Sequence, residues 1–202
     1  MSRRLVLSPF RPFDYNTSML NIFDSIRRHD YLIYKGLHGA IHDRPWLNDS
    51  YLFFAKYGIV FFFLSYIYLI QKKKINAFIT TFVAMTVAFG IDFFIVLFWR
   101  RPRPFISHSD EILRPITEDL RVTSISFPSA HTYIAFAIAT SVFLYGHKRL
   151  GTLLFLLAIG VAIGRVGAGL HYPSDIIGGA LLGIASGVVA VRLVKQRQDR
   201  WQ

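Results

Sequence analysis

Long apolar stretches alternate with short polar segments along most of the chain. Four stretches are long enough to cross a hydrocarbon core of about 30 Å as a helix, namely residues 51–70, 75–99, 150–166 and 176–194. A fifth, shorter stretch covers residues 130–145 and begins directly after Pro128-Ser129, which is typical of a helix entered from a buried loop. The pattern predicts an all-α fold, a polytopic membrane helix bundle with about five transmembrane helices.

The first 50 residues follow a different pattern. Apolar side chains recur there at roughly helical spacing between charged residues, and they are Met19, Leu20, Ile22, Phe23, Ile26, Tyr31, Leu32, Tyr34, Leu37 and Ile41. This favours an N-terminal amphipathic helix in the membrane interface over a sixth span, and a disordered tail is the alternative. We therefore expect two units, an interfacial segment over residues 1–50 and a membrane-embedded domain over residues 51–202.

The composition supports a membrane location. Hydrophobic residues make up 53% of the 202 residues and the mean hydropathy is +0.40, which is too apolar for an ordinary soluble domain of this size. The net charge of +11 could indicate nucleic-acid binding. The basic residues flank the apolar stretches, however, so the expected partners are membrane lipids with anionic head groups rather than nucleic acid. The absence of cysteine excludes disulfides and thiolate chemistry.

Basic residues in the short loops predict the orientation of the bundle. Residues 72–74, residues 148–149 and the basic C-terminal tail all fall on one side of a five-span arrangement. The positive-inside rule places that side in the cytoplasm. The opposite segment, residues 100–128, carries five arginines of its own, which we interpret as phosphate-binding or interfacial charges.

Three polar clusters lie beside the ends of the predicted helices, over residues 100–104, 127–131 and 165–175. Ionisable side chains at membrane depth are costly, so they indicate function. The clusters supply arginines, a serine hydroxyl, two histidines and a carboxylate, which suits phosphoryl transfer. Taken singly, each has a structural explanation, such as a lipid anchor, a helix N-cap or a buried ion pair. The predicted topology places all three on the outer face, which supports a single site.

Together the clusters resemble the signature of the type-2 phosphatidic acid phosphatase superfamily. That signature has three parts, Lys-x6-Arg-Pro, Pro-Ser-x-His and Ser-Arg-x5-His-x3-Asp. The matching residues are Arg103-Pro104, then Pro128-Ser129-Ala130-His131, and then Gly164-Arg165 with His171 and Asp175 at the same internal spacing. The sequence around these motifs is most similar to the bacterial undecaprenyl-diphosphate phosphatase branch.

The resemblance implies roles for three residues of the site. The imidazole of His171 would attack phosphorus and form a phosphohistidine. Asp175, four residues on and one helical turn away, would accept a hydrogen bond from the other ring nitrogen. His131 would protonate the leaving oxygen and then activate water. The family mechanism implies neither a cofactor nor a metal ion.

Phosphate oxygens would be held by Arg103, Arg165, the Ser129 hydroxyl and the backbone N–H groups that begin at Ala130. The chain departs from the signature at three positions, where Val96 replaces the lysine, Ala130 a common glycine and Gly164 the serine. Loss of the lysine removes a phosphate-binding charge. The cations that could replace it are Lys56, Arg100 and Arg101.

These features predict an integral-membrane lipid phosphatase that converts undecaprenyl (isoprenoid) diphosphate to the monophosphate. A phospholipid phosphatase acting on phosphatidylglycerophosphate, phosphatidate or lipid A is the alternative within the same class. A membrane transporter is the alternative from another class, although no internal repeat supports it. We expect a multi-pass protein of the bacterial cytoplasmic membrane with its site on the extracytoplasmic side. The oligomeric state does not follow from the sequence.

Overall fold

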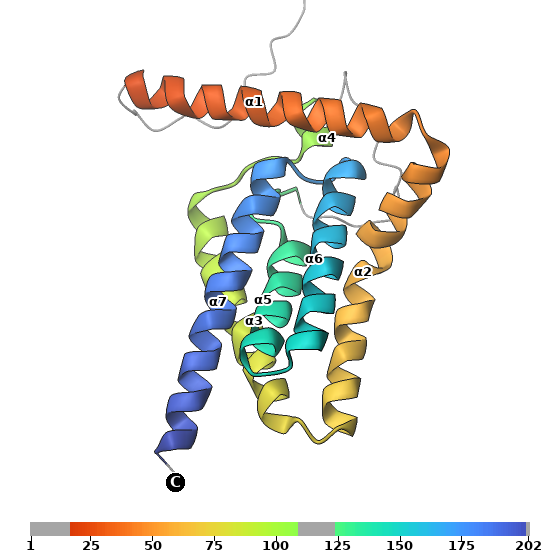
Figure 1. Ribbon diagram of the computed structural model, residues 1–202. Coiled ribbons are helices and arrows are strands. Elements are labelled where there is room, and N and C mark those ends of the chain that lie inside the picture. The colour runs from red at the N-terminus through yellow and green to blue at the C-terminus, as the bar shows by residue number, and fades with distance from the viewer. Residues whose placement is uncertain (1–16, 109–123, 201–202) are drawn as a thin grey trace, which may run out of the picture.

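The computed structural model describes residues 17–108 and 124–200, and the regular elements of these residues are helices. In chain order they are α1 Thr17–His42, α2 Pro45–Gln71, α3 Ile75–Phe98, α4 Pro104–Ser107, α5 Ala130–Leu144, α6 Lys148–Gly167 and α7 Pro173–Asp199. Figure 1 shows a bundle of long helices that run roughly side by side, with α1 lying across one end of the bundle. The expected all-α polytopic bundle is therefore confirmed.

Four helices are long and apolar enough to cross a membrane, and they are α2 from Asp49 onward, α3, α6 and α7. The fifth predicted span, α5, has 15 residues, which corresponds to only about 22 Å of helix. It packs against α3, α6 and α7 in the middle of the bundle, and most of its side chains are buried. A helix surrounded by other helices does not need the full length of a bilayer, because its side chains contact protein rather than lipid.

Helix α2 begins six residues before the expected start of the first span at residue 51. Its first turn contains Pro45, and a proline suits the first turn of a helix because its missing N–H has no intrahelical acceptor there. The expected boundary at residue 50 thus falls inside a helix. Residues 43 and 44 make the short connection between α1 and α2 instead.

Small residues allow the helices that carry the site to approach each other closely. A Cβ atom at Gly183 of α7 would lie 2.4 Å from the Tyr133 carbonyl oxygen of α5, and one at Gly164 of α6 would lie 2.9 Å from the Tyr51 carbonyl oxygen of α2. Both glycines therefore permit backbone contact that any side chain would block. This gives a packing reason for the glycine that replaces the signature serine.

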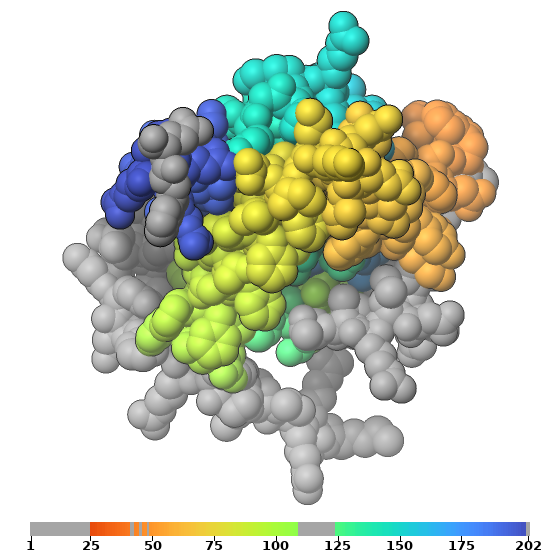
Figure 2. All heavy atoms as spheres, turned by 90° about the horizontal axis from the view of Figure 1, so that it is seen from below, coloured from red at the N-terminus to blue at the C-terminus, as the bar shows by residue number. Residues whose placement is uncertain are grey.

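The segments with basic residues that were used to predict the orientation lie at the end of the bundle opposite α1. The turn between α2 and α3, the start of α6 and the end of α7 meet there, as Figure 2 shows from below. The exposed residues 72–74 and 148–149 lie at this end. The basic loops that predicted the cytoplasmic side are thus on one face of the molecule.

Candidate active site

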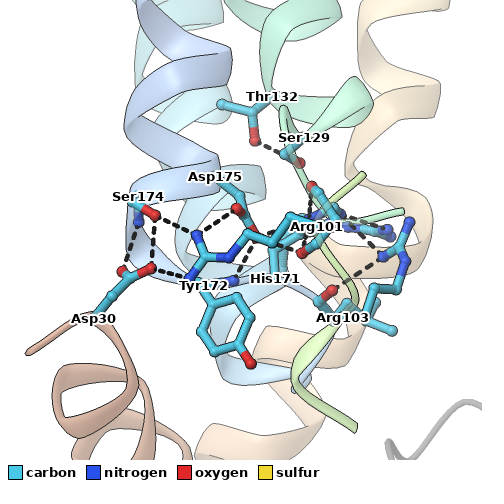
Figure 3. A network of polar contacts seen from close by, with 12 residues as sticks. Asp30, Arg101, Arg103, Ser129, Thr132, His171, Tyr172, Ser174 and Asp175 are labelled. Carbon is cyan, nitrogen blue, oxygen red and sulfur yellow. Dashed lines mark hydrogen bonds and ion pairs between the residues drawn. The ribbon is translucent and has the colours of Figure 1, made fainter. Parts of the chain in front are cut away.

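Three loops beside α1 bring the sequence motifs together. The segment between α3 and α4 carries Arg101 and Arg103, the entry to α5 carries Ser129 and His131, and the α6–α7 loop carries His171. Figure 3 shows side chains from the first and last of these loops in one network of polar contacts, with Asp30 of α1 reaching it from the side. The folded chain therefore joins motifs that lie up to about 70 residues apart in the sequence into one site.

The ring of His171 has a defined orientation. Its Nδ1 lies 2.8 Å from the Ser126 carbonyl oxygen, and because a carbonyl only accepts, Nδ1 carries the proton. The lone pair is then on Nε2, which lies 3.1 Å from Arg103 Nη1 and 3.5 Å from Arg165 Nη2. The unprotonated nitrogen thus faces two guanidinium groups, where a phosphate would be bound.

Asp175 supports this arrangement at a longer distance than the sequence suggested. Its Oδ2 lies 3.6 Å from His171 Nδ1, which is beyond ordinary hydrogen-bond length. His171 precedes α7, so the expected helical turn between the two residues is wrong. Asp175 instead accepts bonds from the Ser126 hydroxyl and, at 2.8 Å, from the Tyr172 backbone N–H. The Asp175 carboxylate is an electrostatic partner of the His171 ring, whereas the Ser126 carbonyl orients the ring.

Burial controls the charge of the two groups beside the phosphate position. His171 is 2% exposed, and this burial, reinforced by Arg165 and Arg103 and opposed by Asp175, lowers the pKa of His171 to about 4. Burial also lowers the pKa of Arg103 to about 10, although Asp175 opposes the change. At neutral pH the imidazole is therefore uncharged and nucleophilic, whereas the Arg103 guanidinium remains a cation.

Arg165 is a buried cation without a carboxylate partner among the described residues. Its side chain is 2% exposed, its Nη1 donates to the Ala55 carbonyl oxygen at 3.3 Å, and its Nε has no acceptor within the described chain. Burying a guanidinium in this state is costly unless an anion binds to it. Arg103, the other guanidinium beside His171, donates to the Leu170 carbonyl oxygen at 3.0 Å.

The start of α5 carries the residues of the second sequence motif, whose binding to phosphate stays a prediction. Ser129 is the N-cap residue, yet its side chain makes no capping bond and its Oγ instead accepts from Thr132 Oγ1 at 3.1 Å. Ala130 begins the helix, so its backbone N–H belongs to the unpaired first turn. His131 follows and lies near enough to Arg103, Arg165 and His171 to interact with their charges.

The three candidate replacements for the missing lysine lie in different surroundings. Lys56 is exposed on α2, with its ammonium 5.4 Å from the centre of the Tyr57 ring, and Arg100 is exposed. Arg101 is engaged, because it donates to Asp30, Ser174 and Asp175. That any of the three binds phosphate stays a prediction, and Val96 itself is half-buried on α3.

Sequence reasoning missed three members of the network, Ser126, Asp30 and Ser174. Ser126 lies three residues before Ser129, so its closeness to the second motif was the available signal. Nothing in the local pattern around Asp30 distinguishes it from a solvated charge on an amphipathic helix. Within residues 17–108 and 124–200, no group of three or more His, Cys, Asp or Glu side chains is arranged to hold a metal ion.

Comparison with known proteins agrees with the motifs. The family model described as the PAP2 superfamily matches residues 77–199, which is more than half of the chain. The chain belongs to the PAP2 superfamily. With its apolar helices, this membership makes it a multi-pass membrane enzyme, a lipid phosphatase.

Two curated relatives and one solved structure are similar to this chain over most of its length. Undecaprenyl-diphosphatase BcrC of Bacillus subtilis is 30% identical over 81% of this chain and 83% of its own length. The undecaprenyl-diphosphatase of Sulfolobus acidocaldarius is 29% identical over 68% of this chain and 66% of its own length. The crystal structure of LpxE from Aquifex aeolicus superposes with a TM-score of 0.65 at 27% identity, covering 80% of this chain and 94% of that one.

Proposed function

We propose that this phosphatase hydrolyses undecaprenyl diphosphate to the monophosphate and inorganic phosphate through a phosphohistidine at His171. The observation that carries the mechanism is the position of His171 Nε2, 3.1 Å from Arg103 and 3.5 Å from Arg165. The undecaprenyl-diphosphatases among the relatives support the choice of substrate.

In the first step, the lone pair of His171 Nε2 forms a bond to the terminal phosphorus. The bond from phosphorus to the bridging oxygen breaks, and His131 donates a proton to that oxygen, which leaves with the lipid monophosphate. Arg103, Arg165 and the first N–H groups of α5 neutralise the equatorial oxygens. The ring becomes positively charged, and the Ser126 carbonyl and the Asp175 carboxylate stabilise it through Nδ1–H.

The second step returns the enzyme to its starting state. Water attacks phosphorus while His131, now the base, accepts the proton from that water. The bond between phosphorus and Nε2 breaks, so inorganic phosphate leaves and His171 regains its lone pair.

A diphosphate also needs a partner for its second phosphate. Arg100 and Arg101 are the two candidate arginines. The guanidinium of Arg101 already donates to oxygen atoms of three residues, so the exposed Arg100 is the better supported of the two. We expect Arg100→Ala to reduce turnover of a lipid diphosphate more than turnover of the matching monophosphate. Equal losses on both substrates would contradict a role for Arg100 in binding the second phosphate.

The direct test measures phosphate release from undecaprenyl diphosphate by the purified protein in detergent, with rapid-quench trapping of the phosphoenzyme. We expect no phosphohistidine in His171→Ala and slow formation in His131→Ala when the leaving group is good. His147→Ala, at the opposite end of the bundle, is the matched control and should behave as wild type. Trapping of the phosphoenzyme in His171→Ala at wild-type amounts would exclude this nucleophile.

The same preparation tests the proposed independence from metal ions. We expect activity to survive chelators and to be inhibited by vanadate, because vanadate mimics five-coordinate phosphorus among arginines and histidines. Loss of activity in chelator that one divalent ion restores would contradict this part of the proposal.

The phospholipid alternative is supported by the similarity to LpxE. The apolar residues along the helices are generic, so the lipid tail gives little discrimination. The values of kcat/KM for undecaprenyl diphosphate, phosphatidylglycerophosphate, phosphatidate and lipid A decide between them. A higher value for one of the phospholipids would replace the proposed substrate while leaving the phosphohistidine chemistry in place. Family membership favours hydrolysis over the transporter hypothesis.

We further propose that the protein lies in the bacterial cytoplasmic membrane with its active site on the extracytoplasmic side. The support is that the exposed basic residues 72–74 and 148–149 lie at the end of the bundle opposite α1 and the proposed catalytic loops, and the positive-inside rule assigns that end to the cytoplasm.

A further inference from the structure

Helix α1 contacts the catalytic end through a polar and aromatic stripe. Asp30, Tyr34 and His38 recur every four residues and are 5%, 0% and 7% exposed. Four apolar side chains of the same helix are 45–55% exposed, and they are Ile26, Leu32, Ile33 and Leu37. Burial of a carboxylate in place of available apolar side chains is costly unless the carboxylate is paired. The pairing of Asp30 is therefore the feature to explain.

Both oxygens of Asp30 accept hydrogen bonds, from Arg101 and from Ser174 in the first turn of α7. Oδ1 accepts the Ser174 backbone N–H at 2.9 Å, and Oδ2 accepts the Ser174 hydroxyl at 2.6 Å and Arg101 Nη2 at 2.5 Å. The other arm of the same guanidinium, Nη1, donates to Asp175 Oδ1 at 2.9 Å. Figure 3 shows Arg101 between the two carboxylates.

The guanidinium is also confined from one face. Its central carbon lies 3.9 Å from the centre of the Tyr172 ring, and the Arg101 side chain is 15% exposed. A planar guanidinium that is stacked and bonded on both arms has little freedom to rotate. Its position against Asp175 is thus determined by Asp30 at one side and by Tyr172 at its face.

We propose that Asp30 is a positioning residue for the phosphoryl transfer. It holds Arg101 against Asp175, and thereby fixes the carboxylate that stabilises the imidazolium formed when His171 attacks phosphorus. The inference rests on the proposed function, because it concerns the phosphohistidine step. Asp30 lies outside the residues that match the family model, so the N-terminal helix contributes to a site whose motifs all lie in the bundle.

The expected effect is on the chemical step rather than on substrate binding. Without the Asp30 charge, Arg101 keeps its contacts with Ser174, Asp175 and Tyr172 but loses the partner of its Nη2 arm, so the Asp175 carboxylate is held less firmly when the ring becomes charged. We expect Asp30→Asn to lower the single-turnover rate of phosphoenzyme formation by roughly 10- to 100-fold, the factor that corresponds to losing a hydrogen bond between charged groups. KM should change less than twofold.

The test compares Asp30→Asn, Arg101→Gln and the double variant in rapid-quench experiments with undecaprenyl diphosphate. We expect the double variant to be no slower than the slower single variant, because both changes break the same interaction, the ion pair between Asp30 and Arg101. Asp30→Glu, which keeps the charge, should recover part of the rate. The matched control is His38→Ala, which removes a 2.9 Å bond between α1 and the Gly167 carbonyl oxygen without touching Arg101.

Each outcome decides the proposal. An equal loss in His38→Ala and Asp30→Asn would assign Asp30 to docking of α1 alone, and a raised KM with an unchanged phosphorylation rate would assign Arg101 to substrate binding. Fully additive losses would show that the two residues act separately. A wild-type protein that forms no phosphohistidine overturns the proposed function together with this inference. A wild-type rate in Asp30→Asn, beside normal phosphohistidine formation, overturns the inference only.

Discussion

At the residue scale, Ser126 contacts both His171 and Asp175, the proposed catalytic pair. Its carbonyl accepts the Nδ1 proton of His171 and its hydroxyl donates to Asp175. A single residue thus sets the tautomer of the ring and donates one of the hydrogen bonds that the carboxylate accepts. This arrangement leaves Nε2 as the only ring nitrogen with an available lone pair.

Ser126→Ala should lower kcat by roughly tenfold or more and change KM little. The variant keeps the carbonyl that orients His171 but removes a hydrogen bond to a charged carboxylate, which is worth about 1.5–3 kcal/mol. The measurement is steady-state kinetics on a lipid diphosphate. Ser141→Ala removes a buried hydroxyl within α5 that bonds to Ala137, and it should retain wild-type kinetics. Equal losses in both variants would indicate a general packing effect.

The buried imidazole of His171 predicts a defined pH dependence of stability. Its pKa of about 4 in the folded protein lies below the 6.5 of a free histidine, so the unfolded state binds the proton more tightly. The free energy of unfolding should therefore rise with pH between about 4 and 6.5, and this contribution should be absent in His171→Gln. Thermal unfolding of both proteins in detergent at several pH values measures it. A constant difference across that window would contradict the burial of a neutral ring.

At the element scale, the approach of α5 and α7 places the two catalytic loops side by side. Helix α5 carries His131 near its start and α7 carries Asp175 in its first turn. The Ser129 backbone N–H donates to the Asp175 carbonyl oxygen at 3.2 Å, which links the two helix starts directly. The separation of these helices therefore determines the geometry of the site.

Gly183→Ala should destabilise the protein by about 1–3 kcal/mol, because the new Cβ would lie 2.4 Å from the Tyr133 carbonyl oxygen. It should also reduce activity, since α7 carries Asp175. Unfolding midpoints and kcat are the measurements. Gly90→Ala on α3 is the matched control, with no atom within 4 Å of its Cβ, and it should be neutral or slightly stabilising. Equal effects of the two substitutions would argue against close packing of α5 and α7.

At the scale of the whole molecule, the basic loops that predicted the cytoplasmic side and the proposed catalytic loops are at opposite ends. The site lies beside α1, whereas residues 72–74 and 148–149 lie at the far end. Apolar side chains of α1 are exposed, which suits a helix that lies in the membrane interface. Residues 1–16 of the expected interfacial segment lie outside the described residues.

The absence of natural cysteine allows a direct test of this orientation. Single cysteines at Ser107, beside the site, and at Lys73, in the turn between α2 and α3, are treated with an impermeant thiol reagent in intact cells. We expect labelling at position 107 and protection at position 73 until the cells are opened. The reverse pattern would invert the orientation.

Contiguous residues were sufficient to predict much of this protein. Apolar runs indicated the spans because a segment in lipid must pair its backbone N–H and C=O groups within itself, as a helix does, and must match the thickness of a bilayer. The order and spacing of Arg103, His131 and His171 matched the family signature, and that resemblance implied a nucleophile, an acid and a phosphate-binding cation. The short α5 was also predicted, from the proline and serine that precede it.

The partners of these residues depended on the tertiary structure. The ring of His171 is oriented by the Ser126 carbonyl, 45 positions away, rather than by Asp175 four positions on. Arg101 pairs with Asp30, 71 positions away. The sequence by itself determined the helices and the chemical groups, since periodicity and motif spacing are local properties. Which groups meet was decided only by the packing of α1 and the loops, because long-range hydrogen bonds depend on where separate helices come to lie.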